Sequence, residues 1–106
     1  MKVFKVIGNV TLCRSHPGYV GGRLLATEPL ENALLGGAAP AAPDLLVVWD
    51  DLGAGQDATI AVSDGAEAAQ PFRPEWKAVD AYCTAILDAI HIDPQAVQVC
   101  RKQENN

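Results

Sequence analysis

The chain has 106 residues, of which 49% are hydrophobic and 6% aromatic, and its formal charge is −5 at neutral pH. This length suits one small domain that buries a modest share of its surface, so association with other copies would add stability. Thirteen acidic residues outnumber eight basic ones, and no basic cluster is longer than Arg101-Lys102. The composition therefore argues against a nucleic-acid partner, which requires a cationic surface to neutralise phosphates.

The N-terminal residues and the cysteines indicate a cytoplasmic protein. Residues 1–6 enter an alternating strand at once, without the charged leader or the long apolar stretch of a secretory signal. No apolar run approaches the length of a membrane span, so we expect no membrane partner. Cys13, Cys83 and Cys100 are odd in number and widely spaced, which favours reduced thiols over a disulfide framework.

The first half of the chain predicts two strands and two loops. Alternation over residues 4–12 predicts a strand with one buried face, whose apolar members are Phe4, Val6, Val10 and Leu12. Residues 13–22 contain a proline and three glycines, which predicts a loop. A second strand is expected at about Arg23 to Leu30. Small residues and two prolines within residues 34–43 predict a mobile surface loop.

A third strand and a glycine loop follow. Residues 45–49 are apolar on both faces, which predicts a strand in the middle of a closed barrel, or beneath a helix and a partner chain. A fourth strand is predicted at residues 58–63, so the Gly-Ala-Gly segment at residues 53–55 joins two strands and does not open a helix as a phosphate-binding loop would. Asp50 and Asp51 point to opposite faces of their strand and cannot share a proton. Asp50 is expected to cap the glycine turn by accepting backbone N–H bonds.

The last third of the chain predicts a helix and a closing strand. Apolar residues recur at helical spacing over residues 79–90, and Pro74 suits the first turn of that helix. The apolar positions are Val79, Tyr82, Cys83, Ile86, Leu87 and Ile90. Residues 95–101 are expected to form a short last strand. The predicted fold is therefore mainly β, a five-stranded OB-like β-barrel with one α-helix before the last strand.

No motif points to catalysis, a metal or a cofactor. Cys13, His16 and His91 lack the paired spacing of a zinc site, and neither Ser15 nor Ser63 lies in a nucleophile elbow. We therefore expect no enzyme, no metal and no cofactor. Two alternatives stay open at this point: an OB-type binding module for an oligonucleotide or another protein, and a small enzyme that uses Cys13, His16 or His91. The first is disfavoured because the scattered aromatic residues form no stacking ladder.

Four motifs occur in an order that resembles a known family. They are Val6-x-Gly8-x-Val10, Gly22-Arg23-Leu24-Leu25, Asp50-x-Leu52-Gly53-Ala54-Gly55, and the segment from Arg73-Pro74 to Ile90. Together they resemble the EutN/CcmL family, the pentameric vertex proteins of bacterial microcompartment shells, nearly end to end. There are two departures. The family usually has a second glycine where this chain has Gln56-Asp57, and residues 65–69 lack the hydroxyls and the arginine of the family's G-S-S-A-R-like segment.

The resemblance implies a structural shell protein. Residues 1–106 would form a single EutN/CcmL-like vertex domain, and five copies would form a ring that closes a corner of the shell beside hexameric shell proteins. The location implied is the microcompartment shell in the cytoplasm. Five residues are candidates for subunit contacts or for the lining of an axial opening: Gly53, Ala54, Gly55, Ser15 and His16.

Overall fold

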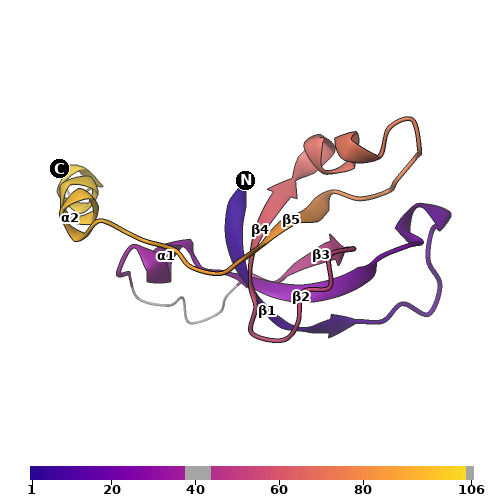
Figure 1. Ribbon diagram of the computed structural model, residues 1–106, viewed down its shortest axis with the longest axis horizontal. Coiled ribbons are helices and arrows are strands. Elements are labelled where there is room, and N and C mark those ends of the chain that lie inside the picture. The colour runs from indigo at the N-terminus through magenta and orange to yellow at the C-terminus, as the bar shows by residue number, and fades with distance from the viewer. Residues whose placement is uncertain (38–43, 105–106) are drawn as a thin grey trace.

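The computed structural model describes residues 1–37 and 44–104, and its centre is a closed barrel (Figure 1). The strands are β1 (Lys2–Val10), β2 (Arg23–Pro29), β3 (Leu46–Asp50), β4 (Thr59–Asp64) and β5 (Ala81–Leu87). Their order around the barrel is β1-β2-β3-β5-β4. Neighbouring strands are antiparallel except β3 and β5, which run parallel and pair at Trp49 and Tyr82.

Four short helical elements connect or follow the strands. They are the 3-10 helix η1 (Pro17–Tyr19), the α-helix α1 (Glu31–Leu34), the 3-10 helix η2 (Gly65–Phe72) and the α-helix α2 (Pro94–Glu104). Most of the surface loop predicted within residues 34–43 lies outside the described residues, which stop at 37 and resume at 44.

The predicted fold class is confirmed, since five strands close into a barrel and a helical element, η2, precedes the last strand. The first four strands begin and end within about two residues of their predicted limits. The barrel interior is filled by apolar side chains that alternate along the strands. They are Phe4, Val6, Leu25, Val48, Ile60, Val62, Ala81 and Cys83, joined by Ala54 from the glycine loop.

The helix predicted over residues 79–90 was wrong, because residues 81–87 form β5. This strand pairs with β4 on one side and with β3 on the other, and neither of its faces is purely polar. Cys83 points into the barrel, while Tyr82 packs on an outer cluster. A register shift between Ala61 and Val62 also interrupts the alternation. Apolar residues therefore recur at uneven spacing, which imitates a helical period.

The closing strand predicted at residues 95–101 was also wrong, because these residues lie in α2. The Oδ1 of Asp93 accepts the N–H of Gln95 at 2.9 Å, and the Asp93 carbonyl accepts the N–H of Val97 at 3.1 Å. Pro94 occupies the first helical position, where its missing N–H costs nothing. An Asp-Pro pair is a helix-start signal, and the alternation of Val97 and Val99 concealed it.

A bulge in β1 reverses its two faces. The pairing of β1 with β2 shifts between Val6 and Gly8. Beyond this point Val10 lies opposite Leu24 on the outer wall, and Leu12 is 42% exposed. The single buried face predicted over residues 4–12 is therefore correct only for its first half. The bulge moves apolar side chains from the core to the surface of the barrel.

Candidate functional site

The glycine loop is held by the carboxylate of Asp50, the residue predicted to cap it. Asp50 is 1% exposed at the end of β3. Its Oδ1 accepts the N–H of Leu52 at 3.0 Å, and its Oδ2 accepts those of Gly53 at 3.1 Å and Ala54 at 2.9 Å. Burial would raise the pKa of this carboxyl, but the backbone donors outweigh it and hold the pKa below the ordinary 3.8. The loop therefore stays ordered around a buried negative charge.

Arg23 ties the loop to the neighbouring strand. It lies opposite Asp50 in the β2–β3 pairing. Its Nη2 donates to the carbonyl of Ala54 at 2.7 Å and lies 3.4 Å from the Oδ2 of Asp50. Because one nitrogen serves both partners, Arg23 bridges the start and the middle of the loop.

The three residues of the Gly-Ala-Gly segment have different environments. The side chain of Ala54 packs in the barrel core at 1% exposure, which corrects the expectation that it is available for a subunit contact. Gly53 has φ of 93°, a conformation that favours glycine. A Cβ at Gly55 would meet no atom within 4 Å, and its φ is not positive. Nothing within the described subunit therefore requires glycine at position 55.

Asp57, in the Gln56-Asp57 pair that follows the Gly-Ala-Gly segment, has an unusual backbone conformation. Among the described residues other than glycine, only Asp57 has a positive φ, which is 67°. Its N–H donates to the Val6 carbonyl at 2.9 Å, and its Oδ1 lies 3.7 Å from the Nζ of Lys5. Aspartate tolerates this left-handed conformation better than most residues do. Asp57 therefore holds a turn conformation that otherwise favours glycine.

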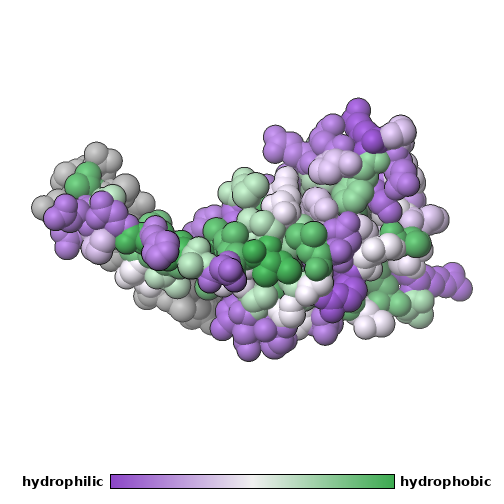
Figure 2. Space-filling model, viewed as in Figure 1, coloured by the Kyte–Doolittle hydropathy of each residue, from purple (hydrophilic) through white to green (hydrophobic). Residues whose placement is uncertain are grey.

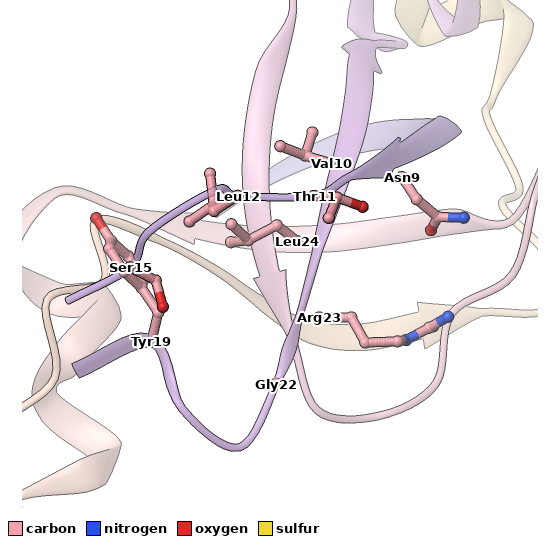
Figure 3. Close-up of a pocket in the computed structure, with 9 residues that line it drawn as sticks. All are labelled: Asn9, Val10, Thr11, Leu12, Ser15, Tyr19, Gly22, Arg23 and Leu24. Atoms are coloured by element: carbon pink, nitrogen blue, oxygen red, sulfur yellow. The ribbon is translucent and has the colours of Figure 1, made fainter. Parts of the chain in front are cut away.

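The loop at residues 13–16 lies beside a surface cavity of about 390 Å³ (Figure 3). Ser15 lines this cavity together with Tyr19, Gly22 and Arg23. Gly53 lines a neighbouring cavity that also includes Gly22 and Arg23. The fold therefore brings Ser15 and Gly53, two of the predicted site residues, to adjoining depressions.

His16 faces a different neighbour. Its Nδ1 accepts the N–H of Gly18 at 2.9 Å and so caps η1, and its ring meets the ring of Trp76 edge-on at 4.4 Å. Trp76 is 74% exposed. His16 is therefore separate from the cavity that Ser15 lines.

The aromatic residues, which are scattered along the sequence, form an outer cluster that the sequence patterns did not predict. Trp49 is 3% exposed on the outer wall, and its Nε1 donates to the Tyr19 carbonyl at 2.8 Å. Phe72 meets Trp49 edge-on at 5.2 Å, and the Nζ of Lys77 lies 5.4 Å from the Trp49 ring. Gly22 leaves room for this ring, since a Cβ there would collide with it. The Gly21-Gly22 pair in the sequence was the signal that another part of the chain, here the Trp49 ring, packs closely against the backbone.

Neither a metal-binding cluster nor an activated Cys83 thiol is found among the described residues. Among residues 1–37 and 44–104, no group of three or more His, Cys, Asp or Glu could hold a metal ion. Burial, followed by the charge of Asp50, raises the pKa of the Cys83 thiol to about 12, so this cysteine is a poor nucleophile. No helix in the described part of the chain combines the length and hydropathy needed to cross a membrane.

Comparison with known proteins decides the family. A family model described as ethanolamine utilisation protein EutN/carboxysome matches residues 1–88. The chain belongs to the EutN/CcmL family. The resemblance seen in the motifs is thereby confirmed, and the matched region contains all five strands of the barrel.

Similar proteins include a carboxysome shell vertex protein and a pentameric microcompartment shell protein. The carboxysome shell vertex protein CcmL of Thermosynechococcus vestitus is 32% identical over 93 residues, which are 88% of this chain and 89% of that protein. The pentameric microcompartment shell protein GrpN from Rhodospirillum rubrum is 29% identical, with a TM-score of 0.69 over 88% of this chain and 100% of that one. CcmL of Nostoc sp. PCC 7120 is 32% identical, with a TM-score of 0.71 over 86% and 93% of the two chains.

Proposed function

We propose that this EutN/CcmL family member is a structural subunit of a bacterial microcompartment shell, where five copies form a ring at each vertex. Related proteins that cover nearly the whole chain are named shell vertex or pentameric shell proteins. The proposed location of the protein is therefore the microcompartment shell, inside the cytoplasm. A closed polyhedral shell needs five-fold corners, which a five-membered ring supplies by its symmetry.

The observation that carries this proposal is the apolar outer wall of a barrel whose interior is already full. Leu45, Val47 and Leu12 are 63%, 44% and 42% exposed, although they belong to or adjoin strands. Large exposed apolar surfaces mark contacts with other proteins. The interior of the barrel is packed with the apolar side chains of the strands and of Ala54. The surface therefore serves association.

The ring is proposed to sit among hexameric shell proteins, whose flat layer it closes, and the protein to catalyse no reaction. Gly53, Gly55, Ser15 and His16 are the exposed candidates for subunit contacts or for the edge of an axial opening. Replacing Gly55 with Val tests this role, since it adds bulk where the isolated subunit has open space.

Two measurements test the proposed function. Native mass spectrometry at micromolar concentration should give a pentamer, and a stable monomer or dimer would contradict the proposal. Deletion of the protein from a host that has no second vertex protein should leave the enclosed enzymes active but the shells elongated or leaky. Normal closed shells in that host would refute the vertex role.

A further inference from the structure

The chain after β5 forms an arm that leaves the barrel. Residues 88–104, here called the C-terminal arm, comprise a connection of six residues and α2. Figure 1 shows α2 standing away from the barrel, and no other described element packs extensively against it. The arm contributes to a molecule 47 Å long but only 28 and 26 Å across. An isolated helix of 11 residues is marginally stable in water, so α2 requires a partner surface.

The arm carries apolar side chains that the described part of its own subunit leaves partly exposed. Ile92 is 40% exposed and Val99 is 56% exposed, and Ile86 at the end of β5 is 46% exposed. Figure 2 shows a band of hydrophobic residues along the chain between α2 and the barrel. The family model ends at residue 88, where the arm begins, so α2 lies outside the matched region.

A groove on the barrel is lined by apolar side chains, as the arm is. It is a depression of about 330 Å³ on the outer wall, and we call it the outer groove. Its main lining residues are Leu12, Tyr19, Leu24, Val47, Trp49 and Val79. Among the described residues that line it, Asp80 alone carries a charge. Leu12 and Leu24 gather on the same side of the β1–β2 pair in Figure 3, whereas Asn9 and Arg23 point away from them.

The arm and the outer groove of the same subunit lie at opposite ends of β5, so the arm does not fill its own groove. Ala81, at the start of β5, lines the groove, and the arm begins after Leu87 at the other end of that strand. Seven residues of strand span about 20 Å. In Figure 1, α2 lies at one end of the molecule, and the η1 connection and the segment that follows η2 lie at the other. The apolar arm and the apolar groove therefore face different directions.

We infer that the C-terminal arm of one subunit lies in the outer groove of the next subunit around the ring. Cyclic rings are built from heterologous interfaces, in which two different surfaces of identical chains meet. An arm at one end and a groove at the other form such a pair, and the contact would bury Ile92 against Val47 and Leu24. The inference rests on the proposed pentamer, since it names the surfaces that join its subunits.

Cysteine cross-linking in the full-length chain tests the pairing. Cys13 and Cys100 are first replaced by serine, and Cys83 is buried. Ile92→Cys combined with Val47→Cys, treated with a short bismaleimide, should give a covalent ladder that ends at the pentamer. Each single variant should give at most a dimer. Ile92→Cys combined with Leu52→Cys is the matched control, because Leu52 is 50% exposed but lies outside the groove.

The oligomeric state of the same samples separates the possible failures. One result is a pentamer by native mass spectrometry in which Ile92→Cys cross-links equally to Val47→Cys and to Leu52→Cys, or to neither. Either form of this result overturns the arm-and-groove pairing and leaves the proposed ring intact. A monomer overturns both. In a second measurement Ile92→Asp should raise the subunit dissociation constant at least tenfold, whereas Val20→Asp, at a 66% exposed position outside both surfaces, should leave it unchanged. Equal effects of the two substitutions would also overturn the inference.

Discussion

Arg23 and Asp50 face each other across β2 and β3, but they share their ion pair unequally. The Arg23 side chain is 54% exposed and that of Asp50 is fully buried, with 3.4 Å between Nη2 and Oδ2. A half-exposed cation is well screened by water and contributes little to such a pair. The three backbone N–H donors of the glycine loop are shorter contacts, at 2.9 to 3.1 Å. The loop backbone therefore stabilises the carboxylate, and Arg23 chiefly anchors the Ala54 carbonyl.

Asp50→Asn should destabilise the folded subunit by about 2–3 kcal/mol, because it replaces charge-assisted bonds and points an amide group at backbone donors. Chemical denaturation measures the loss. Asp51→Asn is the matched control, because Asp51 is exposed and accepts a bond from the Tyr82 hydroxyl at 3.1 Å. Its effect should stay within about 0.5 kcal/mol. Equal effects of the two substitutions would show that the buried carboxylate does not organise the loop.

Asp50 should also make the subunit sensitive to acid. Its pKa in the folded chain lies below the ordinary 3.8, so the folded state binds the proton less readily than the unfolded state. The stability that it contributes is fully present above pH 3.8 and is lost as the pH falls through the lower folded pKa. Stability measured from pH 6 down to pH 2 should therefore decline less steeply in Asp50→Asn. If stability falls equally steeply with pH in the parent and in Asp50→Asn, Asp50 is not the cause of the acid sensitivity.

The two glycines of the loop should respond differently to alanine. Gly53→Ala forces an L-residue to φ of 93° and should cost about 1–2 kcal/mol of subunit stability. Gly55→Ala adds a Cβ in open space and should leave the melting temperature of the isolated subunit unchanged. Thermal unfolding of both variants checks the contrast. Equal losses would mean that residue 55 is constrained within the subunit.

Asp57 gives a test of backbone strain, because it is a residue other than glycine with positive φ. Asp57→Ala should destabilise the subunit by about 1 kcal/mol, since alanine tolerates φ of 67° less well than aspartate. Asp57→Gly should match or exceed the parent in stability, because the exposed contact with Lys5 contributes little. Denaturation midpoints rank the three proteins. A Gly variant less stable than the Ala variant would contradict the argument.

The barrel could be predicted from the sequence because its first four strands have clear boundaries. Alternation and turn residues limit each of them, and a strand apolar on both faces, such as β3, already indicates a covered outer wall. β5 could not be assigned in this way. Its pairing with β3 and β4 is a long-range property, and it leaves a local pattern that fits a helix equally well.

The candidate site was only partly predictable for a related reason. Capping of a glycine turn by Asp50 depends on residues two to four positions away, so local chemistry suffices to suggest it. The burial of Ala54 and the bulge at residue 7 depend on how strands meet across the barrel. The aromatic cluster around Trp49 joins β3, η2 and β5, and no spacing along the chain announces it.

The two described cysteines should differ sharply in reactivity. Cys13 is exposed, while Cys83 is buried inside the barrel and has a pKa of about 12. At pH 8 that pKa leaves a thiolate fraction of about 10⁻⁴. In a Cys100→Ser background, a thiol reagent should modify Cys13 at the rate of a free thiol, and Cys83 only after unfolding. Burial is the larger cause of the raised pKa and Asp50 the smaller, so Cys83 should stay protected in Asp50→Asn as long as that variant remains folded. Modification of Cys83 in the folded parent at the rate of Cys13 would show that the barrel opens and that its interior is not the sealed core described above.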